Sequence, residues 1–287
     1  MIDEKLVRAL ISEQFPEWRD LPVRAVERQG VDNRTYRLGD DMSVRLPSGE
    51  GYVAGVAKED RWLPVIAEHL DMPVPAPVAI GKPGEGYPFP WSVRRWLTGD
   101  TVESADPDRT RLAGDLGAFL AALRKIPAGG GPIAGRHSFF RGCHPSVYAE
   151  EVHNAFDTVE GLDAEACRDI WHAAMTTAWT HDPVWFHGDV AVGNLIAEDD
   201  RLSAVIDFGT CGVGDPACDL VMAWTHFRGE ERRVFRDAAG LDDDEWRRGR
   251  GWALWKALAV IAWPDSGAEQ IAAQEKVLTE VLADPVV

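Results

Sequence analysis

The spacing of apolar residues changes near residue 100, and this change constrains the fold more than any other feature of the sequence. Before it, short runs of β-branched and apolar residues such as VRAVERQG, RTYRLGD and MSVRLPS are separated by glycine, aspartate and proline. After it, apolar residues recur at helical spacing, and helices are predicted near 112–123, 145–160, 164–180, 215–228, 243–263 and 267–283. The sequence therefore predicts an α+β chain in which strands come first and helices follow.

Two helices are also expected in the strand-rich part. The first fifteen residues form an amphipathic pattern, and acids interrupt them too often for a signal peptide. A second helix is predicted from about Val53 to Leu70, with Pro64 expected to kink it or to begin a new helix. No apolar run approaches the roughly 18 residues that a membrane span requires, and the four cysteines show no CxxC pairing. We therefore expect a cytoplasmic protein that is a monomer or a homodimer and does not contact membranes.

Acidic residues are concentrated in the second part of the chain. The formal net charge is −17, of which residues 98–287 contribute −15. Such a surface repels nucleic acid and attracts cations. No nucleic-acid partner is therefore expected.

One segment of the second part combines residues suited to phosphoryl transfer. His187-Gly188-Asp189 is followed by Asn194 on the same predicted loop, and Asp207 ends the next predicted strand before Phe208-Gly209. Transfer to a hydroxyl needs a carboxylate that orients the hydroxyl and accepts its proton, together with metal ions that neutralise the phosphate oxygens. Magnesium prefers such hard oxygen ligands. Asp189 can serve as the base, with Asn194 and Asp207 as metal ligands.

The order of these motifs resembles the aminoglycoside phosphotransferase family, which comprises small-molecule kinases related to the protein kinases. The resemblance implies a protein-kinase-like two-lobe fold. Residues 1–97 would form a nucleotide-binding lobe with an antiparallel sheet, and residues 98–287 a helix-rich lobe for catalysis and acceptor binding. It also implies that Asp189 is the catalytic base and that Asn194 and Asp207 bind Mg²⁺ or Mn²⁺. His187 would be a structural member of the loop, and Asp215 and Asp219 would brace it.

The resemblance extends to the nucleotide, which is expected to be ATP or GTP. Arg45, on the third predicted strand, stands where most kinases carry a lysine that contacts the phosphates, and Glu59 would be its helical partner. Further contacts are expected from Gly30 and Asn33 in the hairpin over the phosphates, and from Arg95 and Trp96 in the hinge between the lobes.

The predicted acceptor is a cationic antibiotic of the aminoglycoside type, because the second part of the chain is acidic. Asp157 and Glu160, placed three apart on one predicted helical face, are the expected amine contacts. A macrolide, or a small metabolite such as homoserine, choline or a sugar, is an alternative acceptor. A catalytically silent nucleotide-binding module is an alternative function, and a metallohydrolase is disfavoured because the eight histidines are scattered.

Overall fold

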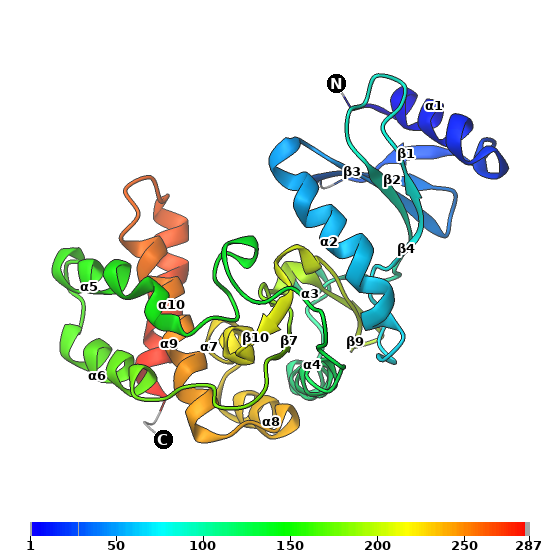
Figure 1. Cartoon of the computed structure of the whole chain (residues 1–287). Coiled ribbons are helices and arrows are strands. Elements are labelled where there is room, and N and C mark those ends of the chain that lie inside the picture. Colours follow the sequence, from blue (N-terminus) through cyan, green and yellow to red (C-terminus); the bar gives the residue numbers. More distant parts are fainter. Residues whose placement is uncertain (1, 28, 285–287) are drawn as a thin grey trace. The chain divides into compact units, whose positions relative to one another are not determined.

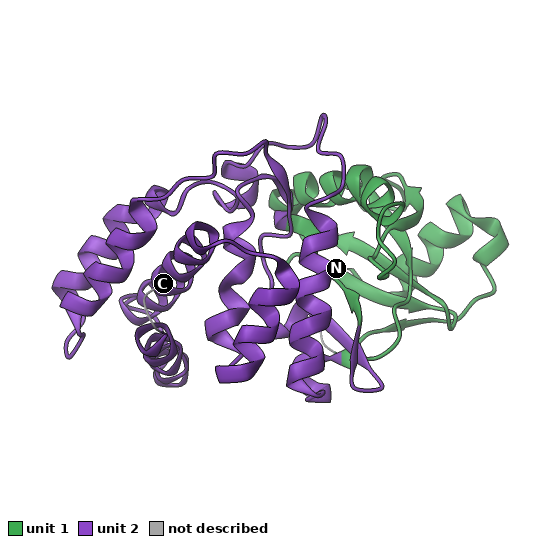
Figure 2. Cartoon of the chain, turned by 90° about the horizontal axis from the view of Figure 1, so that it is seen from below, with its two compact units in different colours: residues 1–100, 203–209 green, residues 101–202, 210–287 purple. Residues whose placement is uncertain are grey.

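The computed structural model describes residues 2–27 and 29–284, and the chain divides into two compact units (Figures 1 and 2). Unit 1 contains residues 1–100 together with 203–209, and unit 2 contains residues 101–202 and 210–287. The first unit thus ends after Asp100 rather than after Leu97, and it includes the later segment that carries Asp207.

Unit 1 is built on a five-stranded antiparallel sheet in the order β1-β2-β3-β5-β4. Its strands are β1 (Val23–Ala25), β2 (Asn33–Leu38), β3 (Met42–Pro47), β4 (Pro77–Gly81) and β5 (Trp91–Arg95). Gly39, with φ at 62°, makes the turn between β2 and β3, because glycine adopts this left-handed conformation without strain. The predicted strand-rich first part is confirmed.

The two faces of this sheet differ in polarity because successive side chains of a strand point to opposite faces. One face presents Val44, Leu46 and Val93, which join a buried apolar core with α1 (Glu4–Gln14). The other face presents Arg45 and Arg94, which contact carboxylates of α2 (Glu50–Ala67). Pro64 lies inside α2 and begins no new helix. A 3₁₀ helix, η1 (Pro16–Trp18), follows α1.

Unit 2 is mainly helical, and α9 (Asp243–Ile261) is a long helix with buried residues along most of its length. It contacts α5, α6, α10 and η6. Gly249 allows this packing, because a Cβ atom there would lie 2.8 Å from the Leu220 side chain. The other helices are α3 (Val102–Ala105), α4 (Arg109–Leu123), α5 (Ala149–Thr158), α6 (Ala164–Met175), α7 (Met222–Thr225), α8 (Gly229–Ala239) and α10 (Ala268–Ala283).

Short strands and 3₁₀ helices connect these α-helices. β7 (Val184–Phe186) pairs antiparallel with β10 (Gly212–Gly214), and β8 (Leu195–Glu198) lies between β6 (Asp100–Thr101) and β9 (Arg201–Val205). The 3₁₀ helices are η2 (Arg136–Ser138), η3 (Pro145–Tyr148), η4 (Val192–Asn194), η5 (Phe208–Thr210) and η6 (Pro216–Val221). Together with unit 1, these elements confirm the predicted α+β class.

Several helix predictions need correction. The predicted helix over 145–160 begins as η3 and ends at Thr158, and that over 215–228 is split into η6 and α7. The predicted helix over 164–180 ends at Met175. Helix α8 was not predicted. None of the described helices is long and apolar enough to cross a membrane.

Candidate functional site

A tight turn after β7 carries His187, Gly188 and Asp189. The backbone N–H groups of His187 and Gly188 each donate to the Asp219 carboxylate at 2.7 Å, and Asp219 is only 2% exposed. Burial raises the pKa of Asp219, although His187 and the two N–H donors favour its charged form. Asp219, in η6, therefore fixes the backbone that presents Asp189.

Gly188 has a backbone conformation that other residues adopt only with strain, with φ at 86°. A Cβ atom at this position would also lie 2.9 Å from the Thr210 hydroxyl oxygen. The glycine between His187 and Asp189 is thus required by the turn itself.

Asp189 and Asn194 lie side by side in unit 2. The Asn194 side-chain amide donates to the Asp189 backbone oxygen at 2.9 Å and to its carboxylate Oδ2 at 3.1 Å. Asp189 is half-buried, and its own N–H donates to His187 Nδ1 at 3.1 Å. The loop therefore presents a carboxylate and an amide oxygen together, which is a donor set that suits magnesium.

Asp207 belongs to unit 1, where it follows β9 with φ at 63°. The next residue, Phe208, donates its N–H to Glu59 Oε1 at 3.0 Å, which ties this segment to α2. Within the described residues, no group of three or more His, Cys, Asp or Glu side chains is arranged to hold a metal ion. Magnesium needs fewer protein ligands than that, because substrate phosphates and waters complete its octahedron. The roles of Asp207 and Asn194 as its ligands stay predictions.

Glu59 is the centre of a buried ion-pair network in unit 1. Its Oε2 lies 3.5 Å from an Arg45 nitrogen and 3.2 Å from an Arg94 nitrogen, and Arg94 also contacts Asp60 at 3.0 Å. Burial would raise the pKa of Glu59, but the guanidinium groups of Arg94 and Arg45 lower it below its usual value. For Asp60 burial outweighs Arg94, and its pKa is raised.

The sequence analysis paired Arg45 with Glu59 but missed the contact of Arg94 with the same carboxylate. The alternation along β5 contained the signal, because Arg94 shares a sheet face with Arg45 while the apolar residues Trp91 and Val93 point to the other.

The other residues of unit 1 that are predicted to contact the nucleotide differ in exposure and in their hydrogen bonds. Gly30 is exposed and its carbonyl accepts from Arg34, whereas Asn33 is buried and its Oδ1 has no partner among the described residues. Arg95 is exposed at the end of β5. The Trp96 N–H donates to the Asp41 carbonyl at 2.7 Å, so this donor is already occupied.

Asp215 differs from its predicted role. Its carboxylate pairs with Arg248 at 2.7 Å and accepts from the Ala217 N–H at 3.0 Å, and Arg248 is 1% exposed. Asp215 thus caps η6 and anchors it to α9, whereas Asp219 accepts from the backbone N–H groups of His187 and Gly188.

Asp157 and Glu160 do not share a helical face, which corrects the prediction. Helix α5 ends at Thr158, and Val159 is extended before a turn at Gly161, whose φ is 74°. Both acids are exposed, and Asp157 lies 3.9 Å from Arg168.

A pocket that includes Asp189 was not predicted. It lies within unit 2, and its lining comes from four separate parts of the chain: Arg141, Gly188, Asp189, Val190, Cys218, Val221, Trp252, Trp255 and Lys256. Neither Asp157 nor Glu160 lines it.

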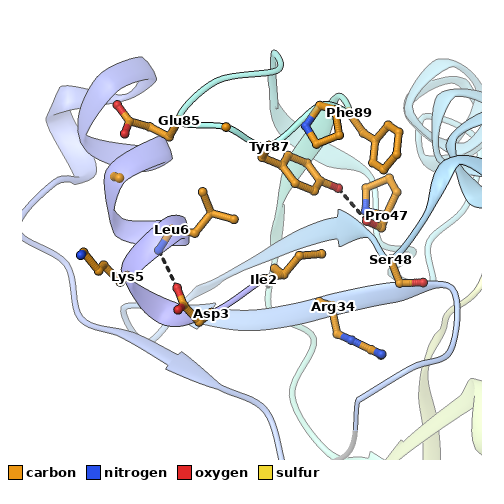
Figure 3. A pocket seen from close by; sticks show the side chains of 13 residues that line it. Ile2, Asp3, Lys5, Leu6, Arg34, Pro47, Ser48, Glu85, Tyr87 and Phe89 are labelled. Carbon is orange, nitrogen blue, oxygen red and sulfur yellow. Dashed lines mark hydrogen bonds between the residues drawn. The ribbon is translucent and has the colours of Figure 1, made fainter.

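Unit 1 also contains a cavity of about 670 Å³ between α1, the ends of β2 and β3, and the loop before β5 (Figure 3). The Tyr87 hydroxyl donates to the Pro47 carbonyl at its wall, and Asp3 accepts from the Leu6 N–H. None of the predicted site residues lines this cavity.

Comparisons with known proteins agree on one family. The model described as "Phosphotransferase enzyme family" matches residues 24–252. The aminoglycoside 3'-phosphotransferase of Escherichia coli is 23% identical over 193 residues, covering 67% of this chain and 71% of that protein.

Solved structures agree in fold. The GDP complex of aminoglycoside 2'-phosphotransferase-IIIa superposes with a TM-score of 0.72 at 22% identity, covering 98% of this chain and 99% of the other. The apoenzyme of macrolide 2'-phosphotransferase MphH from Brachybacterium faecium gives a TM-score of 0.67 at 23% identity, covering 99% and 98%. The kinase-like fold predicted from the motifs is thereby confirmed.

Proposed function

Because the chain belongs to the phosphotransferase enzyme family, we propose that it transfers the γ-phosphoryl group of ATP or GTP to a hydroxyl group of a small molecule. The observation that carries this proposal is the carboxylate of Asp189, held beside the Asn194 amide on a turn that Asp219 fixes. A positioned carboxylate of this kind is what transfer to a hydroxyl requires of the protein.

In this reaction the acceptor oxygen forms a bond to the γ-phosphorus while the bond to the bridging oxygen of the nucleotide breaks. The hydroxyl proton passes to an Asp189 carboxylate oxygen, and the nucleoside diphosphate leaves. Asn194 and Asp207 are proposed to hold Mg²⁺ or Mn²⁺, which when bound supplies charge neutralisation at the phosphate oxygens. The Asn194 amide also restricts the Asp189 side chain to one orientation.

Unit 1 is proposed to bind the nucleotide. Arg45 is 17% exposed on its side chain, and Glu59, which is almost fully buried, holds it in place. Its guanidinium can therefore contact phosphate without giving up its carboxylate partner. Gly30 and Asn33, and the backbone of Arg95 and Trp96 apart from the occupied Trp96 N–H, are proposed as further contacts.

The named relatives act on aminoglycosides or macrolides, which supports a hydroxylated small molecule as the acceptor. The test is a coupled assay of ADP and GDP release with aminoglycosides, macrolides, hydroxy acids and sugars, followed by ³¹P NMR of the product. We expect acceptor-dependent release and a phosphate monoester. Nucleotide release that no acceptor accelerates, with no phosphorylated product, would refute the proposal.

A further inference from the structure

Asp284 binds hydrogen-bond donors from three different helices of unit 2. Its Oδ2 accepts from the indole N–H of Trp224 in α7 and from that of Trp246 in α9, each at 3.1 Å. Its Oδ1 lies 3.1 Å from a guanidinium nitrogen of Arg232 in α8. Its backbone carbonyl accepts from Arg250 of α9 at 2.6 Å. One residue thus joins the end of α10 to α7, α8 and α9.

The donors that Asp284 binds are all buried. Trp224, Trp246 and Arg232 have almost no exposed surface, and Asp284 itself is half-buried. A buried N–H that loses its acceptor, or a buried cation that loses its carboxylate, destabilises the fold. The positions of the three helices therefore depend on this one carboxylate.

The position of Asp284 is unfavourable for its own helix. Asp284 is the C-cap of α10, where the partial negative charge of the helix dipole disfavours a carboxylate. Among the described residues, the last turn of α10 contains no basic side chain that could compensate. The carboxylate is therefore stabilised by Arg232 and by the two indole N–H groups. This arrangement indicates that Asp284 serves the helices it contacts rather than α10.

One of these helices, α7, is the continuation of η6, which carries Asp219. Helix α7 follows η6 without an intervening residue, so Asp219 and Trp224 lie five residues apart on one continuous helical run. The cluster around Asp284 holds α7 at two points. Asp284 accepts from the Trp224 N–H, and Arg232 donates to the Ala223 carbonyl at 2.7 Å.

The other end of η6 is held separately, by the ion pair of Asp215 with Arg248. Between the two ends, Asp219 accepts from two backbone N–H groups of the turn that presents Asp189. A base must lie within hydrogen-bond distance of the hydroxyl whose proton it accepts, so a small displacement of η6 would reach the reacting atoms. The rate of the reaction therefore depends on what holds α7 in place.

We propose that Asp284 is a positioning residue for phosphoryl transfer. Through Trp224 it fixes α7 and η6, and through Asp219 it fixes the turn that places Asp189. The inference rests on the proposed function, because the position of Asp189 affects a rate only if Asp189 is the base. Trp246 donates to the same carboxylate oxygen but belongs to α9, which is buried along most of its length and does not need this N–H to keep its position.

The test compares Trp224→Phe with Trp246→Phe, since each variant removes one N–H donor of the same oxygen and leaves an aromatic ring in place. Asp284→Ala is the third variant. NMR measures hydrogen exchange of the His187 and Gly188 amides, and each rate is divided by that of the α4 amides in the same variant, because global unfolding accelerates both sets. We expect this ratio to rise about tenfold in Asp284→Ala and Trp224→Phe, as the loss of one hydrogen bond to a charged group implies. It should stay unchanged in Trp246→Phe.

Steady-state kinetics give a second readout. We expect kcat for phosphoryl transfer to fall about tenfold in Asp284→Ala and Trp224→Phe, within the range found for residues that act through others. The KM values of nucleotide and acceptor should stay unchanged, because the base moves while the groups that bind the substrates do not. Trp246→Phe should keep the kcat of the unmodified protein.

An exchange ratio that rises as much in Trp246→Phe as in Trp224→Phe would show a general loosening of the helices and would overturn the inference. An unchanged ratio in Trp224→Phe would overturn it as well, and this variant decides the matter if Asp284→Ala does not fold. A raised ratio with an unchanged kcat would also contradict it and would leave the proposed function intact. If the ratios respond as expected but the unmodified protein phosphorylates no acceptor, the proposed function is refuted, whereas the hold of Asp284 on the turn is supported.

Discussion

Two guanidinium groups share the buried carboxylate of Glu59, but they differ in exposure. The Arg45 side chain is 17% exposed, whereas that of Arg94 is 1% exposed and also contacts Asp60. The difference predicts a division of roles, in which Arg94 neutralises the buried carboxylates and Arg45 remains available to phosphate.

We therefore expect Arg94→Gln to lower the free energy of unfolding by about 3–5 kcal/mol, because it leaves buried carboxylates without their closest cation. Arg45→Gln should lower it much less but raise the KM for the nucleotide. Urea denaturation and nucleotide kinetics separate the two effects, with Arg24→Gln on exposed β1 as the control. Equal losses of stability in both variants, with an unchanged nucleotide KM for Arg45→Gln, would contradict this division.

At the residue scale, His226 is expected to make the stability of the folded protein depend on pH. Burial, together with the Arg109 cation, lowers the pKa of His226 to about 4, against about 6.5 in an unfolded chain. Between these values the unfolded chain binds a proton that the folded chain does not, so stability falls as the pH drops from about 6.5 toward 4. His226→Gln should reduce the loss of melting temperature between about pH 7 and about pH 4.5. His153 is exposed on α5, and the control variant His153→Gln should not change this loss of melting temperature. An identical pH profile for His226→Gln and the unmodified protein would show that this histidine contributes nothing.

At the scale of elements, the segment between β7 and β8 contains two glycines whose surroundings differ, one in the turn after β7 and one in η4. Gly188 has φ at 86° and no room for a Cβ atom, whereas a Cβ atom at Gly193 meets nothing within 4 Å. Gly188→Ala should cost about 1–3 kcal/mol of stability and lower kcat, because strain moves the backbone that presents Asp189. Gly193→Ala should change neither the stability nor kcat appreciably. Thermal melts and initial rates of the two variants decide the matter, and similar effects in both would contradict the assigned role of Gly188.

The elements could be predicted from the sequence where their apolar period is clear. Strands β1, β2 and β3 and helices α4, α9 and α10 follow from it. Helix α8 was missed because GEERRVFRDAA is mostly charged, and its burial depends on Phe235, Ala239 and the buried Arg232 against other helices. The end of α5 was missed because it depends on a glycine turn at 161 that interrupts no apolar pattern.

At the scale of the whole molecule, the motif residues could be predicted but their surroundings could not. Asp189 and Asn194 stand close in sequence on one predicted loop, Asp219 follows further along the chain, and the order of these residues predicted their roles. Arg141 and Lys256 lie far apart in the chain, and only the folded unit 2 brings them to one pocket. The net charge predicts a cationic acceptor, but a sum over the chain contains no information on which charges meet at the site, so this stays a prediction.

At the same scale, nucleotide binding by the protein is expected to depend on Mg²⁺. Fluorescent-nucleotide titrations should show tighter binding with Mg²⁺ than with chelator, and Asp207→Asn should remove this difference, because an amide binds magnesium more weakly than a carboxylate. Asn194→Ala should reduce this magnesium-dependent difference in nucleotide binding less than Asp207→Asn does. Asp199→Asn is a matched control, since Asp199 also has a positive φ, of 49° against 63° for Asp207. A magnesium effect that survives Asp207→Asn would remove this residue from the proposed metal site.

The central claim is that Asp189 acts as the base in phosphoryl transfer, and the rate of Asp189→Asn tests it most directly. The measurement is kcat for acceptor-dependent nucleoside diphosphate release at saturating nucleotide, with nucleotide affinity and melting temperature determined on the same preparation. The structure predicts a fall of about 10² to 10⁴ in kcat with affinity and melting temperature unchanged, because only proton acceptance is lost. Asp169→Asn, exposed on α6, should keep full activity. A kcat for Asp189→Asn within about threefold of the unmodified protein, far short of a lost base, would contradict the claim.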